Sequence, residues 1–218
     1  MKKENNNIAD LRKEYEGPTL ELSDVSGDPI KQFETWFREA QNNDIQEPNV
    51  MTLATSTNEG KPSARIVLLK GVEENGFLFF TNYGSRKGTE LAENPNAALV
   101  FCWLEMARQI RIEGFVQKIS AEDSKNYFQS RPKGSQIGAW ASPQSTIIND
   151  REILENKADE LAKEFADAEK LPLPEFWGGY LLIPTMIEFW QGRINRLHDR
   201  IMYTKQNDGT WTIERLAP

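Results

Sequence analysis

The sequence predicts an α+β fold built on an antiparallel β-barrel. About seven or eight strand-like runs occur along the chain, many in hairpin-like succession, with helices between groups of strands. Strands and helices do not alternate regularly, as a parallel doubly wound sheet requires. The chain has 218 residues, 39% of them hydrophobic, and no internal repeat or long linker divides it. We therefore expect a polar arm over residues 1–27 and a single domain over residues 28–218.

The first half of the chain begins with a helix and continues with strands. Asp28 and Pro29 form an N-cap and a first helical position, and apolar residues follow at helical spacing, which predicts a helix over 29–43. Strand-like runs over 50–57, 62–70 and 77–81 are separated by turn sequences at 58–61 and 74–76. Ser85 can cap a short helix over 86–93, which stops before Pro95.

The second half continues with two strands, over 97–104 and 108–119, before Ser120 and Asp123 form a capping-box signature for a helix that runs to about residue 130. Proline and glycine predict irregular chain over 132–143, and spaced apolar residues predict a long helix over 147–168. Strands over 180–183 and 185–191 follow. A hairpin of strands 200–204 and 211–216 around the turn at 207–209 ends the chain.

Composition excludes several classes of function. The chain has 26 Lys and Arg against 33 Asp and Glu, and the net charge of −7 argues against a nucleic-acid-binding protein. One cysteine, Cys102, rules out disulfide frameworks and thiolate metal sites within a subunit, and one histidine, His198, rules out poly-histidine metal sites, so we expect no metal. No apolar run approaches membrane-spanning length, and no secretory signal is visible, so we expect no membrane partner and a cytoplasmic location.

Four basic clusters stand out against this acidic background: Arg65 with Lys70, Arg86 with Lys87, Arg131 with Lys133, and the arginines between 193 and 200. Solvated surface is the ordinary interpretation of such clusters. However, Ser85, Arg86 and Lys87 fall at the expected start of a helix, where free N–H groups favour an anion. The loop from Arg131 to Ser135 adds cations, a hydroxyl and a glycine. Together the clusters indicate sites for two small phosphorylated ligands.

Two further arrangements bear on these sites. Arg196, His198 and Arg200 recur at a spacing of two, which on a strand would place all three on one face and Leu197 on the other. The alternative is a surface histidine between ion-paired arginines. Arg65 and Lys70 are five residues apart and would point to opposite faces of a regular strand, so they serve two sites unless a bulge intervenes.

Several motifs resemble the pyridoxine (pyridoxamine) 5′-phosphate oxidase family. They are Arg65-Ile-Val-Leu-Leu-Lys70, Phe80-Thr-Asn-Tyr-Gly-Ser-Arg-Lys87, Tyr127-Phe-Gln-Ser-Arg-Pro132, Ser135-Gln-Ile-Gly-Ala-Trp140, Arg196-Leu-His-Asp-Arg200 and the terminal Glu214-Arg-Leu-Ala-Pro218. The resemblance runs from about Leu11 to the end of the chain. It implies a split β-barrel, a homodimer with a C-terminal dimerisation segment, and FMN at the subunit interface.

The resemblance also implies roles for individual residues. The implied FMN contacts are Arg65, Ile66, Val67, Leu68, Leu69, Lys70, Phe80, Thr81, Arg86, Lys87, Gln109, Gln144, Ser145, Trp190 and Arg200. The substrate phosphate would lie among Lys70, Tyr127, Arg131 and Ser135. Arg196 and His198 would face the substrate ring and act in catalysis, and Leu197 would be a further substrate-binding residue. The arm residues Arg12, Lys13, Glu14 and Tyr15 resemble a segment that folds over the substrate.

The implied reaction is oxidation of pyridoxine 5′-phosphate or pyridoxamine 5′-phosphate to pyridoxal 5′-phosphate, with dioxygen as acceptor and hydrogen peroxide as product. Two alternatives share the fold. An NAD(P)H-dependent FMN reductase would retain the clusters at 65–70 and 85–87 but would leave Arg131 and His198 without a role. The second alternative is a non-catalytic carrier of FMN or pyridoxal phosphate.

Overall fold

The computed structural model describes residues 7–11 and 14–218, which form nine strands and five α-helices. The helices are α1 (Pro29–Asn42), α2 (Arg86–Glu93), α3 (Ala121–Ser130), α4 (Lys133–Ala141) and α5 (Glu152–Glu164). The strands are β1 (Val50–Ser56), β2 (Pro62–Leu68), β3 (Gly71–Glu73), β4 (Gly76–Asn82), β5 (Asn96–Trp103), β6 (Arg108–Lys118), β7 (Trp177–Gln191), β8 (Asp199–Lys205) and β9 (Trp211–Arg215). The α+β antiparallel architecture is as predicted.

The chain divides into two compact units. The first comprises the chain up to Pro48 together with Phe101–Arg111 and Met186–Pro218, and the second comprises Asn49–Val100 and Ile112–Thr185. Strands β5, β6 and β7 therefore contribute residues to both units.

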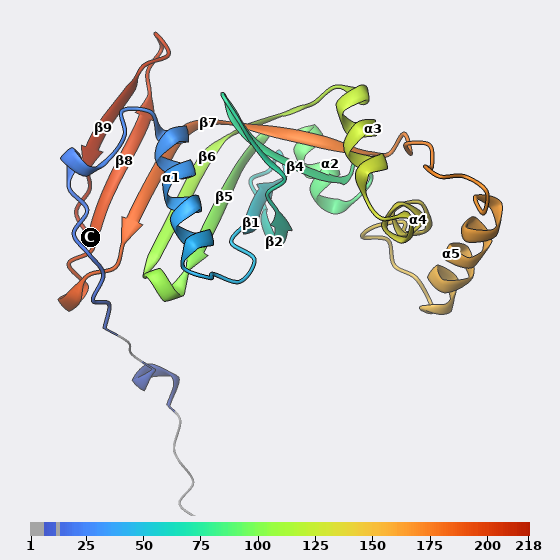
Figure 1. Cartoon of the computed structure of the whole chain (residues 1–218), viewed down its shortest axis with the longest axis horizontal. Helices are drawn as coiled ribbons and strands as arrows, with labels where there is room; N and C mark the ends of the chain where they lie inside the picture. The colour runs from blue at the N-terminus through green and yellow to red at the C-terminus, as the bar shows by residue number, and fades with distance from the viewer. Residues whose placement is uncertain (1–6, 12–13) are drawn as a thin grey trace, which may run out of the picture. The chain divides into compact units, whose positions relative to one another are not determined.

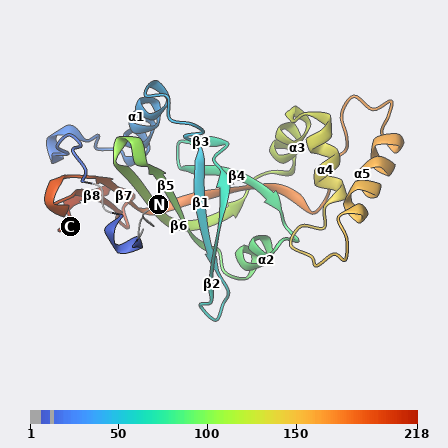
Figure 2. The ribbon, with the colours of Figure 1, turned by 90° about the horizontal axis from the view of Figure 1, so that it is seen from below.

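The second unit is a curled antiparallel sheet with helices beside it. Its strands follow the order β2-β1-β5-β6-β7-β4-β3. In the β1–β2 pair Leu53 lies opposite Arg65 and Thr55 lies opposite Ser63, a register that places the candidate residues of β2 beside those of β1. Buried apolar side chains such as Phe77 and Leu99 fill the sheet's interior. Helices α3, α4 and α5 gather at one end of this unit (Figure 2).

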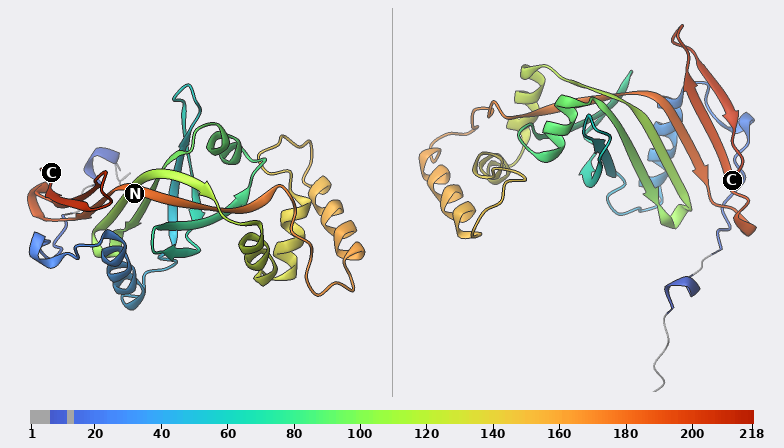
Figure 3. Two further views of the ribbon diagram at one scale, coloured as in Figure 1. Left: turned by 90° about the horizontal axis from the view of Figure 1, so that it is seen from above. Right: turned by 180° about the vertical axis from the view of Figure 1, so that it is seen from behind.

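The first unit consists of an antiparallel meander and α1. Strand β8 pairs with β7 and β9, and the β8–β9 hairpin is the red pair of strands in the right-hand view of Figure 3. Helix α1 lies beside these strands (Figure 1), with its Trp36 ring 5.2 Å from that of Phe189 and its Phe33 ring 5.0 Å from that of Phe101. Burial of these aromatic rings holds the helix on the sheet.

Capping residues predicted from the sequence define the helix starts. The side chains of Asp28, Ser85 and Ser120 accept backbone N–H bonds at the first turns of α1, α2 and α3. These three helices begin where the caps predict them, because each cap satisfies an N–H group that the first turn leaves free.

The expected irregular segment over 132–143 is wrong, because α4 occupies residues Lys133–Ala141. Tertiary contacts override the breaker residues. Gln136 on α4 is buried, donates to the carbonyl of Arg131 at 2.8 Å and accepts from the N–H of Leu171 at 2.9 Å. Two glycines within α4 weaken its intrinsic propensity, and these side-chain bonds and its packing on α5 compensate.

Helix α5 and strand β7 also differ from the prediction. Helix α5 begins at Glu152 instead of residue 147, and the Ile147 side chain is 94% exposed, so this isoleucine is not part of the helix's apolar face. The two strands expected over 180–183 and 185–191 form one strand, β7. Pro184 lies between the segment of β7 that pairs with β4 and the segment that pairs with β8, where its missing N–H is tolerated.

Within residues 7–11 and 14–218, no helix has the length and apolar character needed to cross a membrane. The same residues contain no group of three or more His, Cys, Asp or Glu side chains arranged to hold a metal ion.

Candidate functional site

A pocket of about 560 Å³ in the second unit brings together most of the residues expected to bind phosphate. We call it the cation-lined pocket. Its lining comprises Arg65, Ile66, Val67, Leu68, Lys70, Phe80, Thr81, Asn82, Lys87, Tyr127, Arg131, Pro132, Ser135, Gln144 and Trp177. Four of these side chains carry positive charge, and they come from three separate stretches of the chain, so the fold assembles a cationic site in an acidic protein.

The end of β2 brings Arg65 and Lys70 to the same pocket. The strand stops at Leu68, and the N–H of Lys70 donates to the carbonyl of Leu78 at 2.8 Å. Strand alternation therefore does not extend from Arg65 to Lys70. The expectation that these two residues point to opposite faces of one regular strand is therefore wrong, and both line the cation-lined pocket.

Lys87 stands in the first turn of α2. Its ammonium group donates to Gln144 Oε1 at 2.8 Å, Thr81 Oγ1 at 3.2 Å and Ser85 Oγ at 3.3 Å. Burial and the nearby positive charge of Arg65 both lower the pKa of Lys87. Two cations held this close, near a helix N-terminus, favour a bound anion that relieves their repulsion.

An aromatic wall forms another side of the pocket. The Phe80 ring stacks on Tyr127 at 3.9 Å between centroids and on Trp177 at 5.4 Å. The Arg131 guanidinium lies 4.9 Å above the Trp177 ring. Its Nη1 is buried and has no hydrogen-bond partner in the part of the chain that the structure describes. A buried guanidinium N–H without a partner is costly, and an anionic ligand would satisfy it.

A second pocket, of about 570 Å³, lies in the first unit and contains the sole histidine. We call it the histidine pocket. Its lining comprises Leu11, Glu14, Tyr15, Arg193, Asn195, Arg196 and His198. Two of the four expected arm residues, Glu14 and Tyr15, are thus together with Arg196 and His198. The other two, Arg12 and Lys13, lie outside the described residues.

The expected strand from Arg196 to Arg200 is wrong. Arg196 belongs to a short 3₁₀ turn, Ile194–Arg196, and β8 begins only at Asp199. Asn195 and Arg196 have φ angles of 55° and 61°, a left-handed backbone that turns the chain. This turn places Arg196 and His198 in one pocket without strand alternation, whereas Leu197 is 68% exposed and lines neither pocket.

His198 is held in a defined state by its neighbours. Its Nδ1 accepts a hydrogen bond of 3.1 Å from the backbone N–H of Arg193, and its ring lies 4.6 Å from Trp190 and 5.9 Å from Tyr15. Burial and the positive charge of Arg196 lower its pKa. The imidazole is therefore neutral at neutral pH, with its proton on Nε2.

Some expected cofactor residues line neither pocket: Leu69, Arg86, Gln109, Ser145, Trp190 and Arg200. Arg86 is bonded to Glu90 at 2.9 Å. Arg200 forms a two-point ion pair with the buried Glu188, at 2.8 and 3.1 Å, and its Nη1 donates to the carbonyl of Ala217 at 2.8 Å. The hydrogen bond to Glu188 raises the pKa of Arg200.

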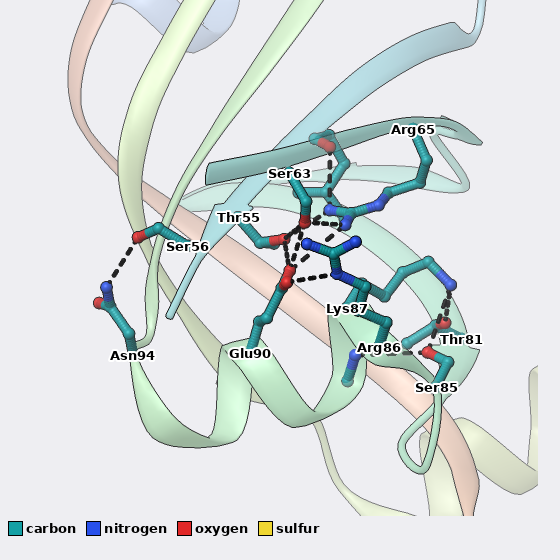
Figure 4. Close-up of polar contacts among 12 residues, drawn as sticks. Thr55, Ser56, Ser63, Arg65, Thr81, Ser85, Arg86, Lys87, Glu90 and Asn94 are labelled. Atoms are coloured by element: carbon teal, nitrogen blue, oxygen red, sulfur yellow. Dashed lines mark hydrogen bonds and ion pairs between the residues drawn. The ribbon is translucent and has the colours of Figure 1, made fainter. Parts of the chain in front are cut away.

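Sequence reasoning did not single out several residues that support these pockets. Trp177 supports Arg131, the backbone of Arg193 orients His198, and the buried Glu90 contacts Arg65 (Figure 4). Trp177 carries a weak signal, since it precedes two glycines at the start of a strand. The other two act through a backbone group and through tertiary register, which local sequence does not reveal.

Comparisons with known proteins place these pockets in context. Residues 37–164 match the family model described as pyridoxamine 5′-phosphate oxidase, and residues 177–218 match the model described as the pyridoxine 5′-phosphate oxidase C-terminal dimerisation region. The chain is 54% identical over 212 residues to the pyridoxine/pyridoxamine 5′-phosphate oxidase of Salinibacter ruber, covering 97% of this chain and 99% of the relative. It is 58% identical over 211 residues to that of a Cyanothece species, covering 97% and 98%.

Solved structures give the same result for the fold. The crystal structure of PhzG from Burkholderia lata, in complex with tetrahydrophenazine-1-carboxylic acid, has a TM-score of 0.86 at 31% identity and covers 93% of this chain and 99% of that one. A pyridoxamine 5′-phosphate oxidase-related, FMN-binding protein from Nostoc punctiforme has a TM-score of 0.70 at 18% identity, with 89% and 100% coverage. The second likeness bears on the fold alone.

Proposed function

Because the chain belongs to the pyridoxamine 5′-phosphate oxidase family, we propose that it is an FMN-dependent oxidase that converts pyridoxine 5′-phosphate and pyridoxamine 5′-phosphate to pyridoxal 5′-phosphate. The acceptor in this proposal is dioxygen and the second product is hydrogen peroxide. The observation that carries the proposal is the cation-lined pocket, where four cations converge beside an aromatic wall. Two phosphate esters need such a charge density, and flat rings pack well on such a wall.

Part of the cation-lined pocket fits the phosphate of FMN. Arg65 and Lys87 lie close enough for the charge of one to lower the pKa of the other, and Lys87 stands in the first turn of α2. A phosphate there would be held by two cations and by free N–H groups of the helix. The chemistry that a bound flavin would supply is acceptance of a hydride from the 4′ carbon of the substrate, with dioxygen as the oxidant that restores it.

The remaining cations of the pocket suit the phosphate of the substrate. We assign it to Lys70, Tyr127, Arg131 and Ser135, all of which line the pocket. The partnerless Nη1 of Arg131 supports this assignment, because a phosphate oxygen is the acceptor it lacks. An anchor remote from the reacting carbon orients the substrate without taking part in the redox step.

Arg196 and His198 are assigned to the pyridine ring of the substrate. His198 accepts at Nδ1 from Arg193, so its Nε2–H is a hydrogen-bond donor. The Arg196 guanidinium contributes a fixed positive charge that favours electron-rich groups on the ring. Neither role requires either residue to gain or lose a proton. Glu14 and Tyr15 line the same pocket, which supports a covering role for the arm.

A homodimer is part of the proposal. The match to a dimerisation region spans 177–218 and includes Trp190 and Arg200. These two residues and Gln109 line neither the cation-lined pocket nor the histidine pocket. We assign them to FMN at the interface between subunits, where a dimer would supply contacts that a single subunit lacks.

An oxygen electrode tests the proposal against its alternatives. Purified full-length protein loaded with FMN should consume oxygen on addition of pyridoxine 5′-phosphate alone and should produce pyridoxal 5′-phosphate in equal amount. Turnover only on addition of NAD(P)H would identify a flavin reductase. Binding of flavin without turnover of either phosphate ester would identify a carrier.

A further inference from the structure

A buried carboxylate stands behind the cation-lined pocket. Glu90 lies on α2, one turn after Arg86, and its side chain is only 5% exposed. It does not line the pocket, so we assign it no direct contact with a ligand. A negative charge beside a phosphate site opposes anion binding unless it has a compensating role. The contacts of Glu90 indicate what that role is.

Glu90 joins two strands and a helix (Figure 4). Its Oε2 accepts a hydrogen bond of 2.6 Å from Ser63 Oγ on β2, another from Thr55 Oγ1 on β1, and lies 3.3 Å from Arg65 Nη2. Its Oε1 accepts from Arg86 Nε at 2.9 Å. The register of β1 and β2 makes this cluster possible, because Thr55 lies directly opposite Ser63.

Besides the direct contact between Glu90 and Arg65, the hydroxyl groups of Thr55 and Ser63 each bridge the two side chains. Thr55 Oγ1 donates its proton to Glu90 and accepts from Arg65 Nη1, and Ser63 Oγ donates to Glu90 and accepts from Arg65 Nη2. Each hydroxyl has a single proton, so it accepts from Arg65 while that proton is donated in a hydrogen bond to the Glu90 carboxylate. Arg65 Nη1 also donates to the carbonyl of Leu53 at 3.2 Å. The carboxylate thus directs a network that fixes the guanidinium on both strands.

The same contacts keep Glu90 ionised. Burial raises the pKa of the carboxyl, but hydrogen bonds from Ser63, Thr55 and Arg86 and the positive charge of Arg86 outweigh burial and bring the pKa to about 2. The group therefore carries its charge throughout the physiological pH range. Removing only that charge, with the shape retained, tests its role.

We propose that Glu90 is a positioning residue for the phosphate of FMN, acting through Arg65. It holds the Arg65 guanidinium against β1 and β2 beside Lys87, so that the two cations receive the phosphate without rearrangement. This inference rests on the proposed function, in which Arg65 binds that phosphate. It adds a residue that contacts neither cofactor nor substrate and that controls affinity for the phosphorylated form of the flavin.

The test compares two flavins that differ only in the phosphate. Dissociation constants for FMN and riboflavin are measured by flavin fluorescence with flavin-free, full-length protein. Glu90→Gln should raise the dissociation constant for FMN about tenfold or more, the scale of one charge-assisted hydrogen bond, and should change that for riboflavin less than twofold. Glu93→Gln is the matched control, since it removes an exposed carboxylate from the end of the same helix and should leave both constants unchanged.

Two further variants complete the test. Ser63→Ala removes one linking hydroxyl and should weaken FMN binding in the same direction by a smaller factor, even if Glu90→Gln does not fold. The double variant Arg65→Ala/Glu90→Gln should bind FMN no more weakly than Arg65→Ala alone, because Glu90 then has nothing to position.

Other outcomes would overturn the proposal. Tighter FMN binding by Glu90→Gln would mean that the carboxylate only repels the phosphate, and an equal loss for FMN and riboflavin would mean a purely structural role. If the wild-type protein does not prefer FMN to riboflavin, or if Arg65→Ala keeps the wild-type preference, the phosphate site of the proposed function fails as well. Loss of phosphate preference in Arg65→Ala without any effect of Glu90→Gln would reject the role of Glu90 alone.

Discussion

The backbone N–H of Arg193 donates a hydrogen bond of 3.1 Å to Nδ1 of His198. A ring nitrogen that accepts carries no proton, so the neutral imidazole has its proton on Nε2. Protonation of His198 would break this bond and would place a second positive charge beside Arg196. Burial and that charge lower the pKa of His198 below its ordinary value of 6.5. The lone histidine is therefore a fixed neutral donor in the histidine pocket.

The titration of His198 can be measured without ambiguity, since the chain contains one histidine. In tag-free protein, its single imidazole signal in an NMR titration should give a pKa below 6.5, and Arg196→Met should move that value upward. Because the folded-state pKa is lower than the unfolded one, the associated stability is present above pH 6.5 and is lost as the pH falls through the folded-state pKa. A pKa above 6.5, or one that Arg196→Met leaves unchanged, would contradict this account.

Arg65 and Arg86 should differ in their effect on FMN retention. Arg65 lines the cation-lined pocket, whereas the Arg86 side chain is 64% exposed and is directed to Glu90. Arg65→Ala should weaken FMN binding about 10- to 100-fold, the range for a lost charged hydrogen bond. Arg86→Ala should cause a smaller loss, measured as flavin content after gel filtration. Equal losses in the two variants would contradict the expected difference between the two arginines.

Local signals in the sequence predict much of the fold and of the cation-lined pocket. Capping residues such as Ser85 act within one turn, so they locate helix starts without knowledge of the tertiary structure. Lys70 and Arg131 lie in short motifs that carry the family resemblance, and the fold places both in that pocket. The sequence does not predict helix α4, because the buried hydrogen bonds of Gln136 that outweigh its unfavourable composition depend on tertiary structure.

The role of Glu90 and the turn at Arg196 could not be predicted from local sequence. Glu90 follows Arg86 at the spacing of an ordinary surface ion pair, and only the register of β1 and β2 brings Thr55 and Ser63 to it. Arg196 has a positive φ, a backbone conformation that residues other than glycine rarely adopt, and no local feature of the sequence predicts it. Contacts set by tertiary structure alone cannot be read from spacing.

Binding of the substrate phosphate should depend on Arg131 more than on the nearby Lys133. Arg131→Lys retains a positive charge but loses the buried Nη1 and the flat group above Trp177. We expect the KM for pyridoxine 5′-phosphate to rise about tenfold, with FMN content unchanged. Lys133→Ala is the control, because its ammonium donates to the carbonyl of Ala166 and lies outside the pocket lining. A fall in kcat at constant KM would argue against a role in phosphate binding.

Arg196 should affect turnover without affecting the cofactor. It lines the histidine pocket, and none of the residues proposed to hold the FMN phosphate lies there, so Arg196→Met should retain FMN at wild-type content. Loss of its fixed charge beside the reacting ring should lower kcat for pyridoxine 5′-phosphate about 100-fold or more, as measured by oxygen uptake and pyridoxal 5′-phosphate formation. Arg151→Met removes an arginine whose side chain is 84% exposed and should change neither quantity. Loss of flavin from Arg196→Met, with normal turnover once FMN is restored, would mean that Arg196 binds the cofactor and not the substrate.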